Sequence, residues 1–200
     1  MLDARVRAVL AALEAEDAAD AAAGAGRTER SLQIAPSSGA LLYALVVGRP
    51  GCAVLEIGGS RGYSTVWLGA AARAAGGRVV SLEADPRKLA RSEATIADAG
   101  LDEVVEIVPG DAFDTLPALG GRFDVCFLDA WKEDYEALYS LARPRIGAGG
   151  LIVADNVCSH AQLGAYSAAR QSDPGLLSVT VPLDNGLEVT SVLTGWLHSE

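Results

Sequence analysis

Asp129 and the pair Asp155-Asn156 each directly follow a short apolar run, over 123–128 and 151–154 respectively. If these runs are neighbouring parallel strands, about 5 Å apart, their ends can reach one ion. Carboxylate and amide oxygens are hard ligands, which suit Mg²⁺, or Mn²⁺ or Ca²⁺, and not zinc. The pattern therefore predicts a divalent-metal site held by these three side chains, although each aspartate alone is also explained by a helix N-cap.

Lys132 stands three residues after Asp129, where the next helix is expected to begin. Residues three apart share one helix face, so its amine can lie near the predicted ion. A lysine beside a divalent cation is pushed toward its neutral form, as a general base requires. The alternative is an ordinary surface lysine. Glu188, shortly after the turn sequence Asn185-Gly186, either points back to the same mouth or is an exposed strand residue.

A glycine loop follows the first apolar run, in the sequence Glu56-Ile57-Gly58-Gly59-Ser60-Arg61-Gly62. Ser60 stands where the dinucleotide fingerprint GxGxxG has its second glycine, and Glu56 would repel a pyrophosphate. Glu83 ends the second run, about 20 residues after the loop, where an acid holds ribose hydroxyls. Loop and acid together indicate S-adenosylmethionine (SAM), a nucleoside with a positive sulfonium and no phosphate. The alternative is a glycine turn with a solvated glutamate in another α/β fold.

The secondary-structure elements that position these residues are indicated by the sequence pattern, in which apolar runs alternate with segments of helix-favouring composition. Runs that are apolar throughout are typical of parallel strands covered by helices on both faces. The predicted strands are 53–57, 78–82, 104–108, 123–128 and 151–154, and the predicted helices are 2–23, one starting after 36–38, 64–75, 86–99 and 132–141. Two last strands, 176–181 and 187–194, flank the hairpin signal Asn185-Gly186. The prediction is an α/β fold with a Rossmann-like, doubly wound, mostly parallel seven-stranded sheet, an antiparallel C-terminal strand pair and helices on both faces.

The chain has 200 residues, half of them hydrophobic, which suffices for one domain with its own core and excludes a disordered chain. We expect a single domain over 1–200, with an N-terminal helical extension over 1–30 and a catalytic core over 31–200. A net charge of −10 argues against nucleic acid and anionic membranes as partners. Three cysteines without zinc spacing, and no recognisable signal peptide or membrane span, indicate a cytoplasmic protein with buried thiols.

Three segments carry a resemblance to a known family: Val54-Leu55-Glu56-Ile57-Gly58, Leu128-Asp129-Ala130-Trp131-Lys132 and Ala154-Asp155-Asn156-Val157. They resemble the metal-dependent class I SAM O-methyltransferases, which include catechol O-methyltransferase and the caffeoyl-CoA O-methyltransferase group. The resemblance runs from about Gln33 to Thr194. Asp-x-Trp-Lys followed by Asp-Asn is specific to that family, whereas many SAM enzymes share the glycine loop. It implies an enzyme that transfers a methyl group from SAM to a small acceptor with vicinal aromatic hydroxyls.

The family pattern also implies a role for each matching residue. Glu56, Gly58, Ser60 and Ser64 would line the methionine end of SAM, and Ile34 would contact it from the helix before the first strand. Glu83 would hold the ribose, Asp111 and Ala112 would flank the adenine, and Trp131 would pack on it. Gly59 and Asp129 complete the set of SAM contacts. Mg²⁺, or Mn²⁺ or Ca²⁺, would be held by Asp129, Asp155 and Asn156. The catalytic residues would be Lys132 as general base, Asp129 beside it, and Glu188 as the ligand of the second acceptor hydroxyl.

Departures from the family pattern leave the acceptor open. Ala130 replaces a histidine of the catechol enzyme, Cys158-Ser159-His160 replaces its proline-containing loop, and no tryptophan precedes Leu32. No obvious basic cluster for a coenzyme A thioester is visible. The alternatives are a non-catalytic or regulatory SAM-binding protein, a methyltransferase that needs no metal, and a NAD-dependent oxidoreductase, against which the missing GxGxxG counts. A homodimer is compatible with the sequence.

Overall fold

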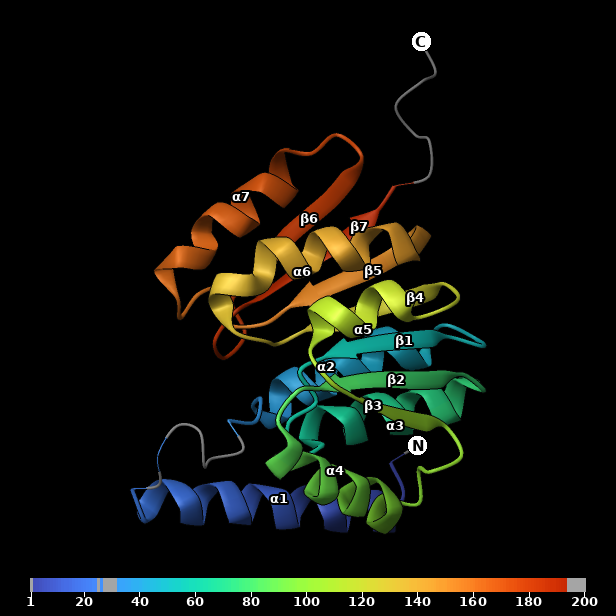
Figure 1. Cartoon of the computed structure of the whole chain (residues 1–200), viewed down its shortest axis with the longest axis vertical. Helices are drawn as coiled ribbons and strands as arrows, with labels where there is room; N and C mark the ends of the chain where they lie inside the picture. The colour runs from blue at the N-terminus through green and yellow to red at the C-terminus, as the bar shows by residue number, and fades with distance from the viewer. Residues whose placement is uncertain (1, 25, 27–31, 194–200) are drawn as a thin grey trace.

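The computed structural model describes residues 2–24, 26 and 32–193. Seven strands form one sheet in the order β3-β2-β1-β4-β5-β7-β6 (Figure 1). The strands are β1 (Ala53–Ile57), β2 (Arg78–Glu83), β3 (Val105–Pro109), β4 (Phe123–Leu128), β5 (Ile146–Ala154), β6 (Leu176–Val181) and β7 (Leu187–Val192). Strands β1 to β5 pair in parallel, and β7 runs antiparallel to both β5 and β6. The predicted α/β architecture with an antiparallel C-terminal pair is confirmed.

Helices cover both faces of the sheet (Figure 1). One face packs against α2 (Pro36–Val47), α3 (Tyr63–Ala75) and α4 (Pro86–Ala99), and the other against α5 (Ala112–Ala118), α6 (Tyr135–Ala142) and α7 (Gly164–Ser172). Helix α1 (Ala4–Ala22) packs against α3 and α4. Buried side chains such as Leu42 and Leu68 form the first core, and Leu138 and Tyr166 belong to the second. Burial on both faces is the reason why the strands read as continuous apolar runs.

The sequence prediction missed two helices and part of one strand. α5 is seven residues long and contains Pro117, and α7 is nine residues long, so neither offers enough turns for a clear helical period. β5 begins at Ile146, five residues earlier than expected, because Gly147, Gly149 and Gly150 read as a turn. The predicted helix over 2–23 is confirmed as α1. Within the part of the chain that the structure describes, no helix is both long and apolar enough to cross a membrane.

The second half of α1 is held by polar contacts over the glycine loop. The buried residues of α1 all lie in its first half, and the last of them is Leu13. The helix packs against α3 and α4. Further along, Glu16 accepts hydrogen bonds from Arg61 of the loop and from Arg91 of α4, both at 2.7 Å. Asp20 accepts a second bond from Arg61 at 3.0 Å. The extension is thereby tied to the segment after β1.

The carboxyl ends of the parallel strands converge where the strand order reverses, between β1 and β4. The loop after β1 lies directly on the residue after β4, since Asp129 N donates to Ile57 O at 3.0 Å. Gly58 has a φ of +99°, and a Cβ on it would collide with the carbonyl oxygen of Asp129. Only glycine accommodates both the left-handed backbone and this close approach. Open α/β sheets bind ligands at such a reversal.

Candidate active site

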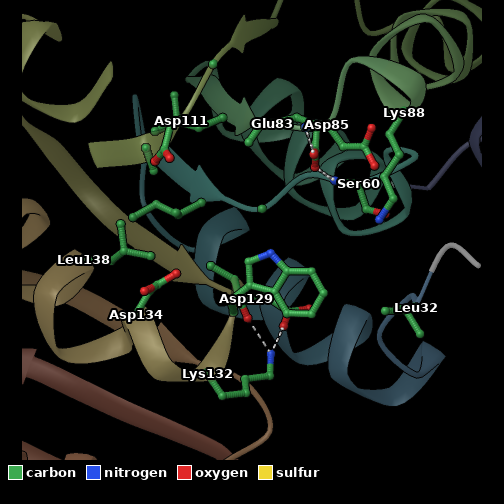
Figure 2. A pocket seen from close by; sticks show the side chains of 18 of the residues that line it. Leu32, Ser60, Glu83, Asp85, Lys88, Asp111, Asp129, Lys132, Asp134 and Leu138 are labelled. Atoms are coloured by element: carbon green, nitrogen blue, oxygen red, sulfur yellow. Dashed lines mark hydrogen bonds and ion pairs between the residues drawn. The ribbon is translucent and has the colours of Figure 1, made fainter. Parts of the chain in front are cut away.

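A cavity of about 830 Å³ lies at this reversal point, within the size range of small-molecule sites. Figure 2 shows Glu83, Asp111 and Ser60 at one end of it, and Asp129 and Lys132 at the other. Of the predicted site residues, the cavity wall contains Gly58, Ser60, Glu83, Asp111, Ala112, Asp129, Trp131, Lys132 and Asn156. The structure thus brings the predicted nucleoside-binding residues and the predicted reaction residues into one space.

The Glu83 end combines fixed carboxylates with an apolar surface. Glu83 Oε2 accepts from Ser60 N at 2.6 Å, and its Oε1 accepts from Asp85 N at 2.7 Å. A carboxylate has about four acceptor sites, so both oxygens can still accept hydroxyl groups. Asp111 caps α5 by accepting from Phe113 N at 2.9 Å, which holds this side of the cavity in place. The geometry suits a nucleoside with a ribose diol.

Trp131 presents a largely exposed indole to the same cavity. It follows β4 by three residues, and 53% of its surface is accessible although the residue is large and apolar. A half-exposed indole beside a cavity offers a flat face on which a planar ring can stack. The predicted position of Trp131 beside the adenine end is compatible with this placement.

Asp129, Asp155 and Asn156 come together at the ends of β4 and β5. Leu128 pairs with Ala154 in the sheet, so the residues that follow them are adjacent, and Asn156 Nδ2 donates to Asp129 Oδ1 at 3.2 Å. Asp155 is only 3% exposed, and its Oδ1 is buried without a hydrogen-bond partner. Burial, and next the neighbouring Asp129 carboxylate, raise the pKa of Asp155 to about 7.

An unpaired buried carboxylate oxygen next to a second carboxylate fits a cation, because a positive charge would offset both the burial and the repulsion. Among the described residues, no group of three or more His, Cys, Asp or Glu side chains is arranged to hold a metal. An ion at this place would therefore depend on the Asn156 amide oxygen as its third protein ligand. This donor set is the hard one that the sequence predicted.

Lys132 lies at the reaction end, in a short 3₁₀ turn over Lys132–Asp134 that precedes α6. Its side chain is 9% exposed, and Nζ donates to Asp129 Oδ1 at 2.7 Å and to Ala130 O at 2.9 Å. The third contact of Nζ is the hydroxyl of Tyr135 at 3.1 Å, and this hydroxyl donates to Asp155 O at 3.1 Å. Burial holds the pKa of Tyr135 well above its usual range, so the phenol stays protonated.

Sequence reasoning missed Tyr135, although its spacing was a usable signal. It stands at i+3 from Lys132, the same relation that placed Lys132 next to Asp129. Its ring is almost fully buried in the second core, at 1% exposure. The hydroxyl is therefore a fixed support for the lysine amine and not a mobile group.

Three predicted cofactor residues line a recess next to the main cavity. Ile34 and Ser64 line a small adjoining recess that shares Ser60 and Asp129 with the cavity, and Gly59 lines this recess as well. Ile34 was expected to lie within the helix before the first strand, but it lies just before α2 begins. This recess extends the space at the predicted methionine end of the ligand.

Glu56 does not line either space, which corrects its predicted direct contact with the cofactor. It is 0% exposed at the end of β1, and its carboxylate accepts from the hydroxyls of Thr65 and Ser81. Burial raises its pKa. A Cβ on Gly59 would collide with Ser81 Oγ, so the loop rests directly on this hydrogen-bonded group. Glu56 supports the glycine loop from beneath.

Glu188 is not at the mouth of the site, and this expectation is wrong. It is 0% exposed on β7, where Ser178 and Thr180 of β6 each donate to its carboxylate at 2.6 Å. Gln171 of α7 donates to the same carboxylate at 3.1 Å. Alternation along the strand directs Glu188 under α7 instead of toward the cavity. The residue of this turn that does line the cavity is Asn185.

The prediction of buried thiols holds for two of the three cysteines. Cys52 and Cys126 are buried, and burial raises the pKa of Cys52 to about 11. Cys158 is exposed, because it lies in the loop after β5 and not in a strand. All three are free thiols.

Comparison with known proteins places this architecture in a family. A model described as a methyltransferase domain matches residues 55–157, just over half of the chain, from β1 to the residue after Asn156. The chain belongs to the methyltransferase domain family. The match includes the glycine loop, Glu83, Asp129 and Lys132, which are the groups that surround the cavity.

This methyltransferase domain is 40% identical over 153 residues to "Catechol O-methyltransferase" of Mycobacterium tuberculosis, covering 75% of this chain and 64% of that protein. It is 38% identical over 131 residues to "Catechol O-methyltransferase" of Niastella koreensis, covering 64% of this chain and 59% of that protein. The aligned part is less than two thirds of either relative. The crystal structure of cofactor-bound Rv0187 from MTB matches with a TM-score of 0.78 and 30% identity, covering 95% of this chain and 90% of that one.

Proposed function

We propose that the protein is a SAM-dependent, divalent-metal-assisted O-methyltransferase that acts on small acceptors with vicinal aromatic hydroxyls. The observation that carries the proposal is one cavity with Glu83 and the glycine loop at one end and Asp129, Asn156 and Lys132 at the other. Membership of the methyltransferase domain family and the likeness to two catechol enzymes support it. A reducing cytoplasm suits the three free thiols.

SAM would occupy the end of the cavity between the glycine loop and Trp131, and would supply a methyl group on a positive sulfonium. Glu83, held by two backbone N–H groups, would accept the ribose hydroxyls. Ser60 and Ser64 would line the space at the methionine end. The carboxylates around the cavity, among them Asp111 and Asp129, favour a ligand with a positive centre over a pyrophosphate.

Asp129, Asp155 and Asn156 would hold the divalent ion. Bound there, such an ion supplies a positive charge that favours the ionised form of a phenolic hydroxyl. The unpaired oxygen of Asp155 and the repulsion between the two carboxylates support this assignment. The chain itself contributes a rigid donor set, because both aspartates follow paired strand ends.

Lys132 would take the proton of the acceptor hydroxyl at Nζ. The carbonyl of Ala130 and the hydroxyl of Tyr135 hold this amine at the edge of the cavity, next to Asp129. Tyr135 orients the lysine and does not compete for the proton, because its phenol stays protonated. A base fixed in this way removes the entropy cost of positioning it for each turnover.

The test combines calorimetric SAM binding with methylation of catechol in Mg²⁺ or in EDTA. The wild type is expected to bind SAM and to methylate catechol only with the divalent ion present. Asp155→Ala should abolish turnover while sparing SAM affinity, and Asp102→Ala, an exposed aspartate before β3 at the opposite edge of the sheet, should change neither. Full activity of Asp155→Ala in EDTA would refute the metal role. Binding of NADH in place of SAM would favour the oxidoreductase alternative.

A further inference from the structure

We propose that Asn185 binds the second oxygen of the acceptor, the role that the family resemblance assigns to Glu188. The inference rests on the proposed function and names a further specificity-determining residue of the same site. It starts from a disagreement between sequence and structure. The turn after β6 does contribute a polar residue to the cavity, but that residue is Asn185.

Glu188 has no capacity left for a ligand. Its two carboxylate oxygens accept from Ser178, Thr180 and Gln171, and the residue is 0% exposed. Turning it toward the cavity would break the hydrogen bonds from the half-buried hydroxyls of Ser178 and Thr180 and from the Gln171 amide, and a single new hydrogen bond would not replace them. The carboxylate is therefore a structural link between β6, β7 and α7.

Asn185 is held next to the predicted metal ligands by its backbone. Its carbonyl accepts from Cys158 N at 2.9 Å and from Ser159 N at 3.2 Å, and the next carbonyl, of Gly186, accepts from Val157 N at 3.1 Å. These three donors follow Asn156 directly in the sequence. The turn and the metal-ligand loop thus form one hydrogen-bonded unit, and Asn185 and Asn156 line the same cavity.

The residue before Asn185 anchors the turn on its other side. Asp184 has a φ of +55°, and its Oδ2 accepts from Ser37 Oγ at 2.6 Å and from Ser38 Oγ at 2.7 Å, at the start of α2. Ser38 N donates to the same oxygen at 3.1 Å. Gly186 has a φ of +83°, and a Cβ on it would collide with Cys158. The turn backbone that carries Asn185 is therefore fixed from both sides, so little backbone entropy is lost when this residue binds a ligand.

The amide also suits the charge of the site. It has two donors and an acceptor, so it can bind an acceptor oxygen either as a hydroxyl or as an oxyanion. Asp129 and Asp155 already place two carboxylates beside the predicted ion. A third carboxylate facing an ionised acceptor would repel it, whereas a neutral amide does not.

The experiment compares three variants with the wild type by two readouts. One is the KM for catechol at saturating SAM and Mg²⁺. The other is an absorbance titration with 4-nitrocatechol in Mg²⁺ and S-adenosylhomocysteine, which has no methyl group to transfer. Asn185→Ala should raise both KM and the Kd of 4-nitrocatechol about fivefold, as expected for one lost hydrogen bond. Asn185→Asp keeps the size of the side chain but adds a negative charge. It should raise the Kd of 4-nitrocatechol at least as much as Asn185→Ala does.

The isosteric Glu188→Gln should leave the Kd of 4-nitrocatechol within about twofold of the wild type. A larger effect at Glu188 than at Asn185 overturns the inference, as does rescue by Asn185→Asp or a parallel loss of SAM affinity in Asn185→Ala. A wild type that binds SAM but neither binds 4-nitrocatechol nor methylates any catechol with Mg²⁺ or Mn²⁺ overturns the proposed function itself. The two failures are thereby distinguished.

Discussion

Replacing Asp155 by Asn should flatten the pH dependence of stability in the metal-free protein. Burial and the neighbouring Asp129 carboxylate raise the pKa of Asp155 from 3.8 to about 7 in the folded state. Between these values the folded protein binds a proton that the unfolded chain has lost. The stability that comes with this proton is present at low pH and is lost as the pH rises through the folded pKa.

The size of the effect follows from the shift. Three pKa units correspond to about 4 kcal/mol, and the carboxylate is too buried for solvent to screen much of it. Because Asp129 lies beside it, the titration belongs to the pair of carboxylates. We expect the wild type in EDTA to lose up to about 4 kcal/mol relative to Asp155→Asn between about pH 4 and pH 8.

Urea unfolding followed by circular dichroism measures this difference across the pH range. Comparison with the variant cancels the contribution of other carboxyl groups to the pH dependence. Glu56 is one of these, because burial raises its pKa as well. Added Mg²⁺ should restore the stability of the wild type at the high-pH end and leave Asp155→Asn unchanged. The exposed control Asp102→Asn should follow the wild type. Superimposable profiles of the wild type and Asp155→Asn in EDTA would show that neither burial nor Asp129 raises the pKa of Asp155 in the folded protein.

Further predictions test the base, the loop and the indole. Lys132→Ala should lower kcat by at least about 100-fold without lowering the affinity for SAM measured by calorimetry. An unchanged kcat would show that the lysine is not the base. Gly58→Ala should lower the urea midpoint more than Gly76→Ala. Both glycines have a positive φ, but a Cβ at Gly58 meets the Asp129 carbonyl and one at Gly76 meets nothing within 4 Å, so equal losses contradict the close approach. Trp131→Phe should abolish most of the tryptophan fluorescence change on S-adenosylhomocysteine binding, and a full signal would place the indole away from the ligand.

The sequence alone determined the sheet and the position of most site residues along it. A parallel strand buried on both faces must be apolar throughout, so its end is visible as the first polar residue after the run. For this reason the amino-acid pattern suffices to place Glu83, Asp129 and Asp155 at strand ends. Neighbouring parallel strands end at the same edge, so the meeting of Asp129 with Asp155-Asn156 followed from strand order alone.

Tertiary structure decided which way the remaining polar side chains point. Glu188 and Asn185 lie three residues apart around one turn, yet β7 pairing and the cover of α7 bury the first while the turn presents the second to the cavity. Glu56 likewise points beneath the glycine loop, where Thr65 and Ser81 meet it. In a strand, a shift of one position exchanges the two faces, and the face that becomes buried depends on elements distant in sequence. The local sequence pattern does not indicate which distant elements will pack against a given side chain.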